Sequence, residues 1–235
     1  MAFDATVRRW DFGAWGRLMR IGLPAGGEFA LMFVYMAVIY WIIRPFGQDA
    51  QAGFGVGMRL NQSLFLPAMA VAFATAPIVG QNYAAGKFAR VRETFVRAAL
   101  IDAVIMGALT LLCQWRAEWL VRAFTTEPGA VAVAVATQFL KLISLNFIAY
   151  GLVFTCSAVF QGLGNTVPSV LSAATRIVSF IVPALWLMHQ PQFRLVELWY
   201  ISIASMTVQA AASLWLVRSQ LRRRMPDAAA ALEAG

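Results

Sequence analysis

Six apolar segments, each long enough to cross a lipid bilayer as a helix, constrain this chain more than any other feature. They cover residues 21–43, 56–80, 95–115, 131–155, 167–188 and 196–217, to within a few positions. Short stretches rich in glycine, proline and polar residues separate them. A backbone inside the bilayer must satisfy its polar groups internally, so these segments are expected to be helices. The pattern predicts an all-α polytopic membrane protein whose six transmembrane helices pack as an up-and-down bundle.

Composition and charge also indicate a membrane protein. Hydrophobic residues make up 60% of the chain and charged residues 13%, which is too little polar surface to enclose a soluble core of this size. The net charge of +8 alone would suggest a nucleic-acid partner. The basic residues, however, lie at the ends of the apolar segments. We therefore predict contacts with anionic membrane lipids and no nucleic-acid binding.

The distribution of Lys and Arg predicts which side of the membrane is cytoplasmic. Arg44, Arg116, Arg122 and Arg194 lie on one side. The other side carries a larger set, namely Arg8, Arg9, Arg17, Arg20, Lys87, Arg90, Arg92, Arg97, Arg218, Arg222, Arg223 and Arg224. This excess predicts a multi-pass cell-membrane protein with both termini in the cytoplasm.

The two ends of the chain have their own character. Residues 1–20 mix arginines with aromatic residues, and we expect a basic amphipathic segment on the membrane surface there. No cleavable signal peptide is recognisable in them. Residues 218–235 are expected to form a basic cytoplasmic tail that ends in disorder.

Two acidic residues lie more than one turn inside the predicted helices, where an unpaired carboxylate is costly. Glu28 lies about two turns into the first segment. It either accepts a proton or contacts a cationic ligand, or it reaches toward the lipid headgroups. Asp102, in the third segment, is a second candidate for ion coupling. Arg97 lies about one turn before it, and a structural pairing of Arg97 with Asp102 is the favoured interpretation.

The fourth segment carries two polar stripes. Gln138 and Lys141, three residues apart, share one helical face. Asn146 and Tyr150, four residues apart, form a second stripe that runs toward Phe154. One stripe can line a cavity while the other bonds to a neighbouring helix. We favour cavity lining for the stripe of Asn146 and Tyr150.

Besides Arg97, two arginines lie within the predicted helices. Arg59 is near the outer end of the second segment, and Arg176 is near the middle of the fifth. An arginine at such depth generally bonds to backbone carbonyls or to an acid. We therefore expect structural roles, and anchoring in particular for Arg176.

Several kinds of chemistry lack support in the sequence. No phosphate-binding loop of the G-x-x-x-x-G-K-S/T type is present, so ATP hydrolysis is not predicted. His189 is the single histidine, so neither a metal site nor a Ser-His pair can be assembled. The glycines of 53–57 and 162–164 are expected to permit close helix packing rather than to bind a nucleotide. Cys113 and Cys156 lie in apolar segments as buried thiols. We predict a protein that is not an enzyme and that has no cofactor or metal.

Four short stretches, taken in order, carry a resemblance to a known family. They are Ile21-Gly22-Leu23-Pro24, the second segment from Arg59 through Pro67 to Gly80-Gln81-Asn82-Tyr83-Ala84-Ala85-Gly86-Lys87, Phe160-Gln161-Gly162-Leu163-Gly164-Asn165-Thr166 with Pro168, and Arg176 with Pro183. Their order and spacing resemble the multidrug and toxic compound extrusion (MATE) family of cation-coupled exporters. The resemblance implies a fold of two six-helix lobes around a substrate cavity. This chain would supply one lobe, and its basic opening and basic tail resemble the carboxy-terminal one.

The resemblance also suggests where an ion and a substrate would bind. Some relatives have an essential acid on the first helix of this lobe, at the position of Met32, and Glu28 lies one turn earlier on roughly the same face. On the fourth helix, the position at which some members have an acid aligns with Tyr150. The ion-coupling role can therefore be suggested for Glu28 but not simply transferred. Together with the polar stripes of the fourth segment, Met32, Tyr35 and Phe154 are expected to line the substrate cavity.

The function implied by the resemblance is that of half a secondary active multidrug exporter. It would exchange organic cations or amphiphilic compounds against protons or sodium. Because alternating access needs two bodies, the partner would be a second copy of this chain or a separate amino-terminal six-helix lobe. Two alternatives stay open: a non-transporting truncated remnant or membrane scaffold, and a lipid-linked-sugar flippase-like protein of related architecture.

Overall fold

The computed structural model describes residues 12–125 and 129–224, and these residues form helices joined by short turns. The elements are α1 (Phe12–Ile43), the 3-10 helix η2 (Arg44–Phe46), α2 (Gln48–Ala84), α3 (Phe88–Ala123), α4 (Ala130–Ser144), α5 (Phe147–Gly162), α6 (Val167–Met188) and α7 (Leu195–Arg224). Five of the helices are long and apolar enough to cross a membrane, and α4 with α5 makes a sixth crossing if the bent pair counts as one. The predicted all-helical membrane fold is confirmed.

The helices extend beyond several of the apolar segments from which they were predicted. Within the described residues, α1 continues without a break from Phe12 to Ile43, so the part of the expected surface segment that is described belongs to the first long helix. Residues 1–11 lie outside the described residues. At the other end α7 runs to Arg224, and residues 225–235 of the expected tail are likewise not described.

A break divides the expected fourth span. α4 ends at Ser144 and α5 begins at Phe147, and the two helices are bent by 59°. Side chains of α3 bond to the carbonyl groups that the break frees: Thr110 Oγ1 donates to the Ser144 carbonyl over 2.8 Å, and Gln114 Nε2 donates to the Lys141 carbonyl over 2.6 Å. An interrupted helix at membrane depth is stable when neighbouring side chains satisfy its backbone in this way.

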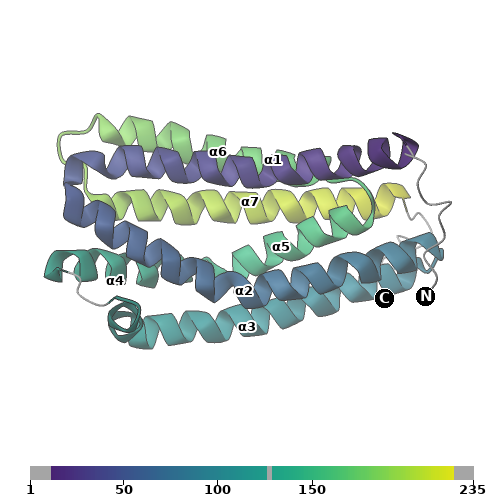
Figure 1. The fold of residues 1–235 in the computed structure, drawn as a ribbon, viewed down its shortest axis with the longest axis horizontal. Coiled ribbons are helices and arrows are strands. Elements are labelled where there is room, and N and C mark those ends of the chain that lie inside the picture. The colour runs from purple at the N-terminus through teal and green to yellow at the C-terminus, as the bar shows by residue number, and fades with distance from the viewer. Residues whose placement is uncertain (1–11, 126–128, 225–235) are drawn as a thin grey trace, which may run out of the picture.

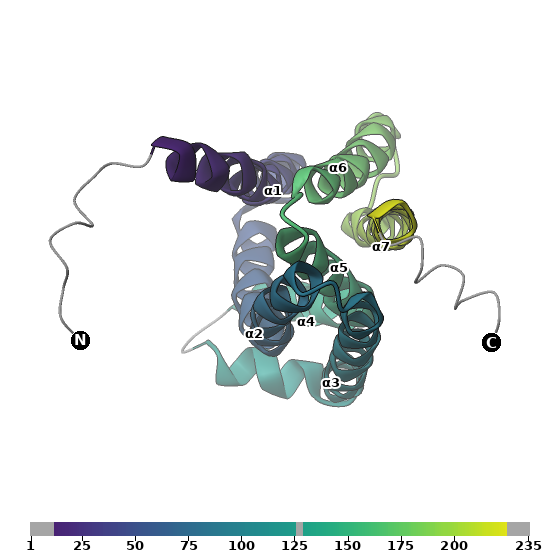
Figure 2. The same ribbon diagram turned by 90° about the vertical axis from the view of Figure 1, so that its right-hand side faces the viewer.

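Viewed end-on, the helices form two groups with α5 at the centre (Figure 2). α2, α3 and α4 pack together on one side of α5, while α1, α6 and α7 lie on the other. α5 also contacts α7, which joins the two groups. In Figure 1 the beginning of α1, the end of α7 and the turns after α2 and α5 all lie at one end of the bundle. The described ends of the chain therefore share a side, as an even number of crossings requires.

Glycines allow the closest helix contacts, as the sequence predicted. A Cβ atom at Gly53 would lie 2.6 Å from the Ala132 carbonyl oxygen of α4, and one at Gly57 would lie 2.5 Å from a ring carbon of Phe139. On the other face of α2, a Cβ at Gly162 would lie 2.7 Å from the Ala76 carbonyl oxygen. These contacts hold α4 and α5 against α2, and they position α5 for the site described next.

Candidate substrate and ion site

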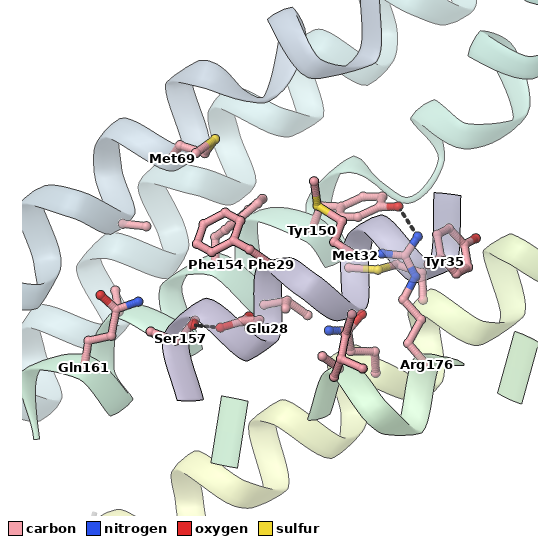
Figure 3. A pocket seen from close by; sticks show the side chains of 18 of the residues that line it. Glu28, Phe29, Met32, Tyr35, Met69, Tyr150, Phe154, Ser157, Gln161 and Arg176 are labelled. Carbon is pink, nitrogen blue, oxygen red and sulfur yellow. Dashed lines mark hydrogen bonds between the residues drawn. The ribbon is translucent and has the colours of Figure 1, made fainter. Parts of the chain in front are cut away.

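A cavity of about 180 Å³ lies where α1, α2, α5, α6 and α7 meet (Figure 3). Its wall is mainly apolar, with a few polar side chains that converge from α1, α5 and α6. The residues that line it are Ala25, Glu28, Phe29, Leu31, Met32, Tyr35, Met69, Ala72, Phe73, Tyr150, Val153, Phe154, Ser157, Ala158, Gln161, Ala173, Arg176, Ile177, Met206 and Gln209. A concave, mostly apolar site with a small number of polar groups is typical of small-molecule binding.

Glu28 supplies the acid of the cavity. It is half-buried on α1, and its Oε2 accepts a hydrogen bond of 2.8 Å from Ser157 Oγ of α5. Ser157 Oγ also lies 3.1 Å from Ser169 Oγ of α6, so the three helices meet at this carboxyl group. Among the described side chains no Lys or Arg lies within 4.0 Å of the Glu28 carboxylate. The site thus holds an acid whose hydrogen-bond donor is neutral and which faces the cavity.

Arg176 supplies the cation of the cavity. Its guanidinium lies over the Tyr35 ring at 4.2 Å from the centroid and over the Tyr150 ring at 4.9 Å, and it donates a hydrogen bond to the Tyr150 hydroxyl. The Tyr35 hydroxyl is hydrogen-bonded to Ser202 Oγ of α7 over 2.7 Å, which fixes one of these rings. The arginine is therefore held by aromatic rings and a hydroxyl group. No described acid lies within ion-pair distance of it.

The structure brings together some of the residues predicted to form the site. Glu28, Met32, Tyr35, Tyr150 and Phe154 all line the cavity. The sequence analysis missed the polar side chains of Ser157, Gln161 and Gln209. Ser157 could have been found, because it lies seven residues after Tyr150 and so on the same face of α5.

Other candidates lie outside the cavity. Gln138 and Lys141 are exposed on α4. Asn146 is buried at the junction of α4 and α5, and its Nδ2 has no hydrogen-bond partner among the described residues. Asn146 and Tyr150 both follow the break and stay one turn apart on α5, but of the two residues Tyr150 alone lines the cavity.

Asp102 is a buried acid of a different kind. Its side chain is fully buried between α3 and α5, where Oδ2 accepts a 2.6 Å hydrogen bond from Thr155 Oγ1 and Oδ1 has no partner. The expected pairing with Arg97 does not occur. Arg97 is exposed and forms an ion pair of 2.6 Å with Glu93, one turn earlier on the same face of α3, whereas Asp102 points toward α5.

Arg59 also differs from Arg176 in its surroundings. It is exposed and lines a second hollow between α1 and α2, together with Tyr40, Gln48, Gln51 and Gln62. The described residues contain no cluster of three or more His, Cys, Asp or Glu side chains that could hold a metal ion.

Comparison with known proteins gives consistent matches to one family. The MatE family model matches residues 24–186. The chain is 28% identical over 162 residues to the probable multidrug resistance protein YpnP of Bacillus subtilis, covering 66% of this chain and 36% of that protein. It is 26% identical over 218 residues to the multidrug export protein MepA of Staphylococcus haemolyticus, covering 92% of this chain and 47% of that protein.

Solved structures show the same fold. An outward-facing conformation of a multidrug resistance MATE family transporter superposes with a TM-score of 0.88 at 18% identity, covering 95% of this chain and 50% of that one. An inward-facing conformation of such a transporter gives a TM-score of 0.79 at 20% identity, covering 92% of this chain and 50% of that one. The chain thus spans about half the length, or less, of the proteins it matches. Because the family model covers well over half of its residues, this chain belongs to the MatE family.

Proposed function

We propose that this chain is one lobe of a multidrug exporter that carries amphiphilic organic compounds out of the cell in exchange for protons or sodium. The observation that carries the proposal is the Glu28 carboxyl group, which faces an aromatic and apolar cavity without a cationic partner among the described side chains. The relatives named as multidrug export or resistance proteins support it. In this interpretation the chain transports and does not catalyse a chemical reaction.

Exchange follows from competition for one carboxylate. Glu28 can hold a proton, a sodium ion or the cationic group of a substrate, but a single carboxylate inside a bilayer cannot neutralise two of them well. Binding of the substrate cation therefore favours release of the coupling ion, and the reverse holds on the other side of the membrane. Ser157 orients the carboxylate toward the cavity through its hydrogen bond.

Transport needs a second body, since alternating access moves two bodies around a shared site. The chain spans about half the length of its relatives, so we propose that the other body is a second six-helix lobe, for which a second copy of this chain and an amino-terminal lobe are the candidates. We infer that the start of α1 and the end of α7 lie on the cytoplasmic side. The basic residues at that end of the bundle, including Lys87, Arg90 and Arg222, support this orientation.

Reconstitution tests the proposal. The full chain, alone or with a co-purified partner, is placed in liposomes that carry an imposed pH or sodium gradient, and efflux of a fluorescent organic cation is measured. Gradient-driven efflux is expected for the wild type and for Glu118→Gln, whose acid is exposed in an ion pair with Arg122. Glu28→Gln should abolish it. Gradient-driven efflux that survives in Glu28→Gln would contradict the role of Glu28.

Crosslinking in native membranes identifies the second body. A self-crosslink at twice the mass of the chain indicates a homodimer, and recovery of a second six-helix protein indicates a separate lobe. If no gradient drives efflux in any of these assemblies, the alternative function is that of a non-transporting membrane scaffold.

A further inference from the structure

We propose that the cavity selects zwitterionic amphiphiles, binding an anionic group of the ligand at Arg176 and a cationic group at Glu28. The inference rests on the proposed function and names the substrate class of the same site. It departs from the expectation of a purely structural Arg176.

The first argument is that the Arg176 charge has no counter-charge in the described structure. Its neighbours are the Tyr35 and Tyr150 rings and the Tyr150 hydroxyl group, and none of these groups carries a negative charge. Its Nε is closed to solvent and has no hydrogen-bond partner. A guanidinium has five N–H donors, and it matches a carboxylate or phosphate with two parallel hydrogen bonds. A buried cation is costly until an anion neutralises it, so the cavity favours a ligand that brings one.

The second argument is the separation of the two charges. On α1, Glu28 and Tyr35 are seven residues apart, and on α5 Tyr150 and Ser157 are also seven apart. α1 and α5 run in opposite directions (Figure 1). Ser157 therefore contacts Glu28 at one end of the cavity, and Tyr150 contacts Arg176, beside Tyr35, at the other end (Figure 3). Seven residues correspond to roughly 10 Å along a helix axis. The acidic and basic ends of the cavity are thus about two helical turns apart.

The third argument is the wall between these ends. Met32 lies between Glu28 and Tyr35 on α1, and Phe154 lies between Tyr150 and Ser157 on α5; both line the cavity. Methionine and aromatic side chains pack against flat apolar surfaces of varied shape. The complementary ligand therefore has an apolar or aromatic body with a cationic group at one end and a carboxylate or phosphate at the other.

Two matched dyes test this selection. Tetramethylrhodamine carries a cationic ring system and a carboxylate, whereas its methyl ester keeps the cation and lacks the anion. Binding of each dye to the full chain in lipid nanodiscs is measured by fluorescence anisotropy. Because a charge-assisted bond is added, the wild type should bind the acid about tenfold more tightly than the ester. Arg176→Gln should remove this preference and Arg176→Lys should keep it. Arg59→Gln, which removes an arginine outside the cavity, should leave it unchanged.

The other outcomes separate the two proposals. Glu28→Gln should weaken both dyes alike. If Glu28→Gln weakens binding of both dyes while the wild type binds the dye acid and its methyl ester with equal affinity, Arg176 is not an anion site. The proposed function is not affected by that result. A preference for the acid that survives in Arg176→Gln also overturns the anion site. If Arg176→Gln does not fold, the wild-type comparison of acid with ester decides alone. Absence of saturable binding of either dye overturns the proposed function and the anion site together.

Discussion

The Glu28 carboxylate on α1 accepts a hydrogen bond of 2.8 Å from the Ser157 hydroxyl on α5, although 129 positions separate the two residues in the sequence. This bond joins α1 to the central helix α5 at the cavity. It also fixes the direction of the one carboxylate that lines the cavity among the described residues.

Ser157→Ala should weaken binding of a cationic dye by roughly tenfold, because a hydrogen bond to a charged group contributes about 1.5–3 kcal/mol. Dye anisotropy measures this change. Ser205→Ala is the matched control, since Ser205 is buried but bonds to the Ser202 carbonyl of its own helix and does not line the cavity. Equal affinity of Ser157→Ala and the control would show that the bond does not orient the acid.

Sequence alone could identify Glu28 but not its partner. An acid within an apolar segment is a local feature, and the cost of burying it makes it conspicuous. The spacing of Ser157 from Tyr150 could place it on the cavity face of α5, but its pairing with Glu28 becomes visible only when the fold brings α5 against α1. The same holds for Asp102, for which a neighbour in sequence, Arg97, was the favoured partner, and the fold supplied Thr155.

Thr155→Val should destabilise the folded protein, because it removes the one described hydrogen-bond donor of the buried Asp102 carboxyl group. The two side chains have nearly the same shape, so the expected loss of about 1–3 kcal/mol reports the unsatisfied acceptor. Thermal unfolding in detergent measures it. Thr207→Val is the control, because Thr207 is exposed and bonds to its own helix backbone. If both variants unfold at the wild-type temperature, the Asp102 contact is not stabilising.

Gly53→Ala should destabilise the contact of α2 with α4. Its Cβ would lie 2.6 Å from the Ala132 carbonyl oxygen and 2.8 Å from Val135 Cβ, so the backbone of α4 has to move. Overpacking of this kind costs about 1–3 kcal/mol. Gly107→Ala meets its nearest neighbour, Ile148, at an ordinary 3.8 Å and should be neutral or slightly stabilising. Size-exclusion profiles after heating compare the two, and equal profiles would contradict the close contact.

Cys113 and Cys156 should not react with a thiol-specific maleimide until the protein unfolds. Both side chains are fully buried and neither forms a disulfide, as the sequence predicted. The rise in fluorescence of a maleimide dye on heating should therefore coincide with the loss of the monodisperse protein. Cys113→Ala and Cys156→Ala separate the two signals, and rapid labelling of either thiol in the folded protein at low temperature would contradict its burial.

The extent to which the fold follows from sequence differs between helices. The apolar segments predicted the helices because length and hydropathy are local properties. The division of the fourth segment was not predicted, since its stretch from 131 to 155 contains no proline and its one glycine, Gly151, lies beyond the break. The carbonyl groups freed there are satisfied by Thr110 and Gln114, about 30 residues earlier in the chain. A break whose partners come from another helix leaves little local signal.

The last prediction concerns this break. In Thr110→Val with Gln114→Leu, the carbonyl groups of Ser144 and Lys141 lose the donors supplied by α3. The Ser144 carbonyl is then left unsatisfied at a cost of about 1–3 kcal/mol, and the Lys141 carbonyl keeps the Ser144 hydroxyl as its donor, so the junction of α4 and α5 should open locally more often. Hydrogen exchange of peptides that span residues 141–150 should then be faster, while exchange in the middle of α6 stays unchanged. Thr94→Val is the control, because the half-buried Thr94 donates only to the Arg90 carbonyl of its own helix. Unchanged exchange across the junction in the double variant would show that these two side chains of α3 do not stabilise the break, and the α4–α5 bend would then rest on the packing of both helices against α2, α3 and α7.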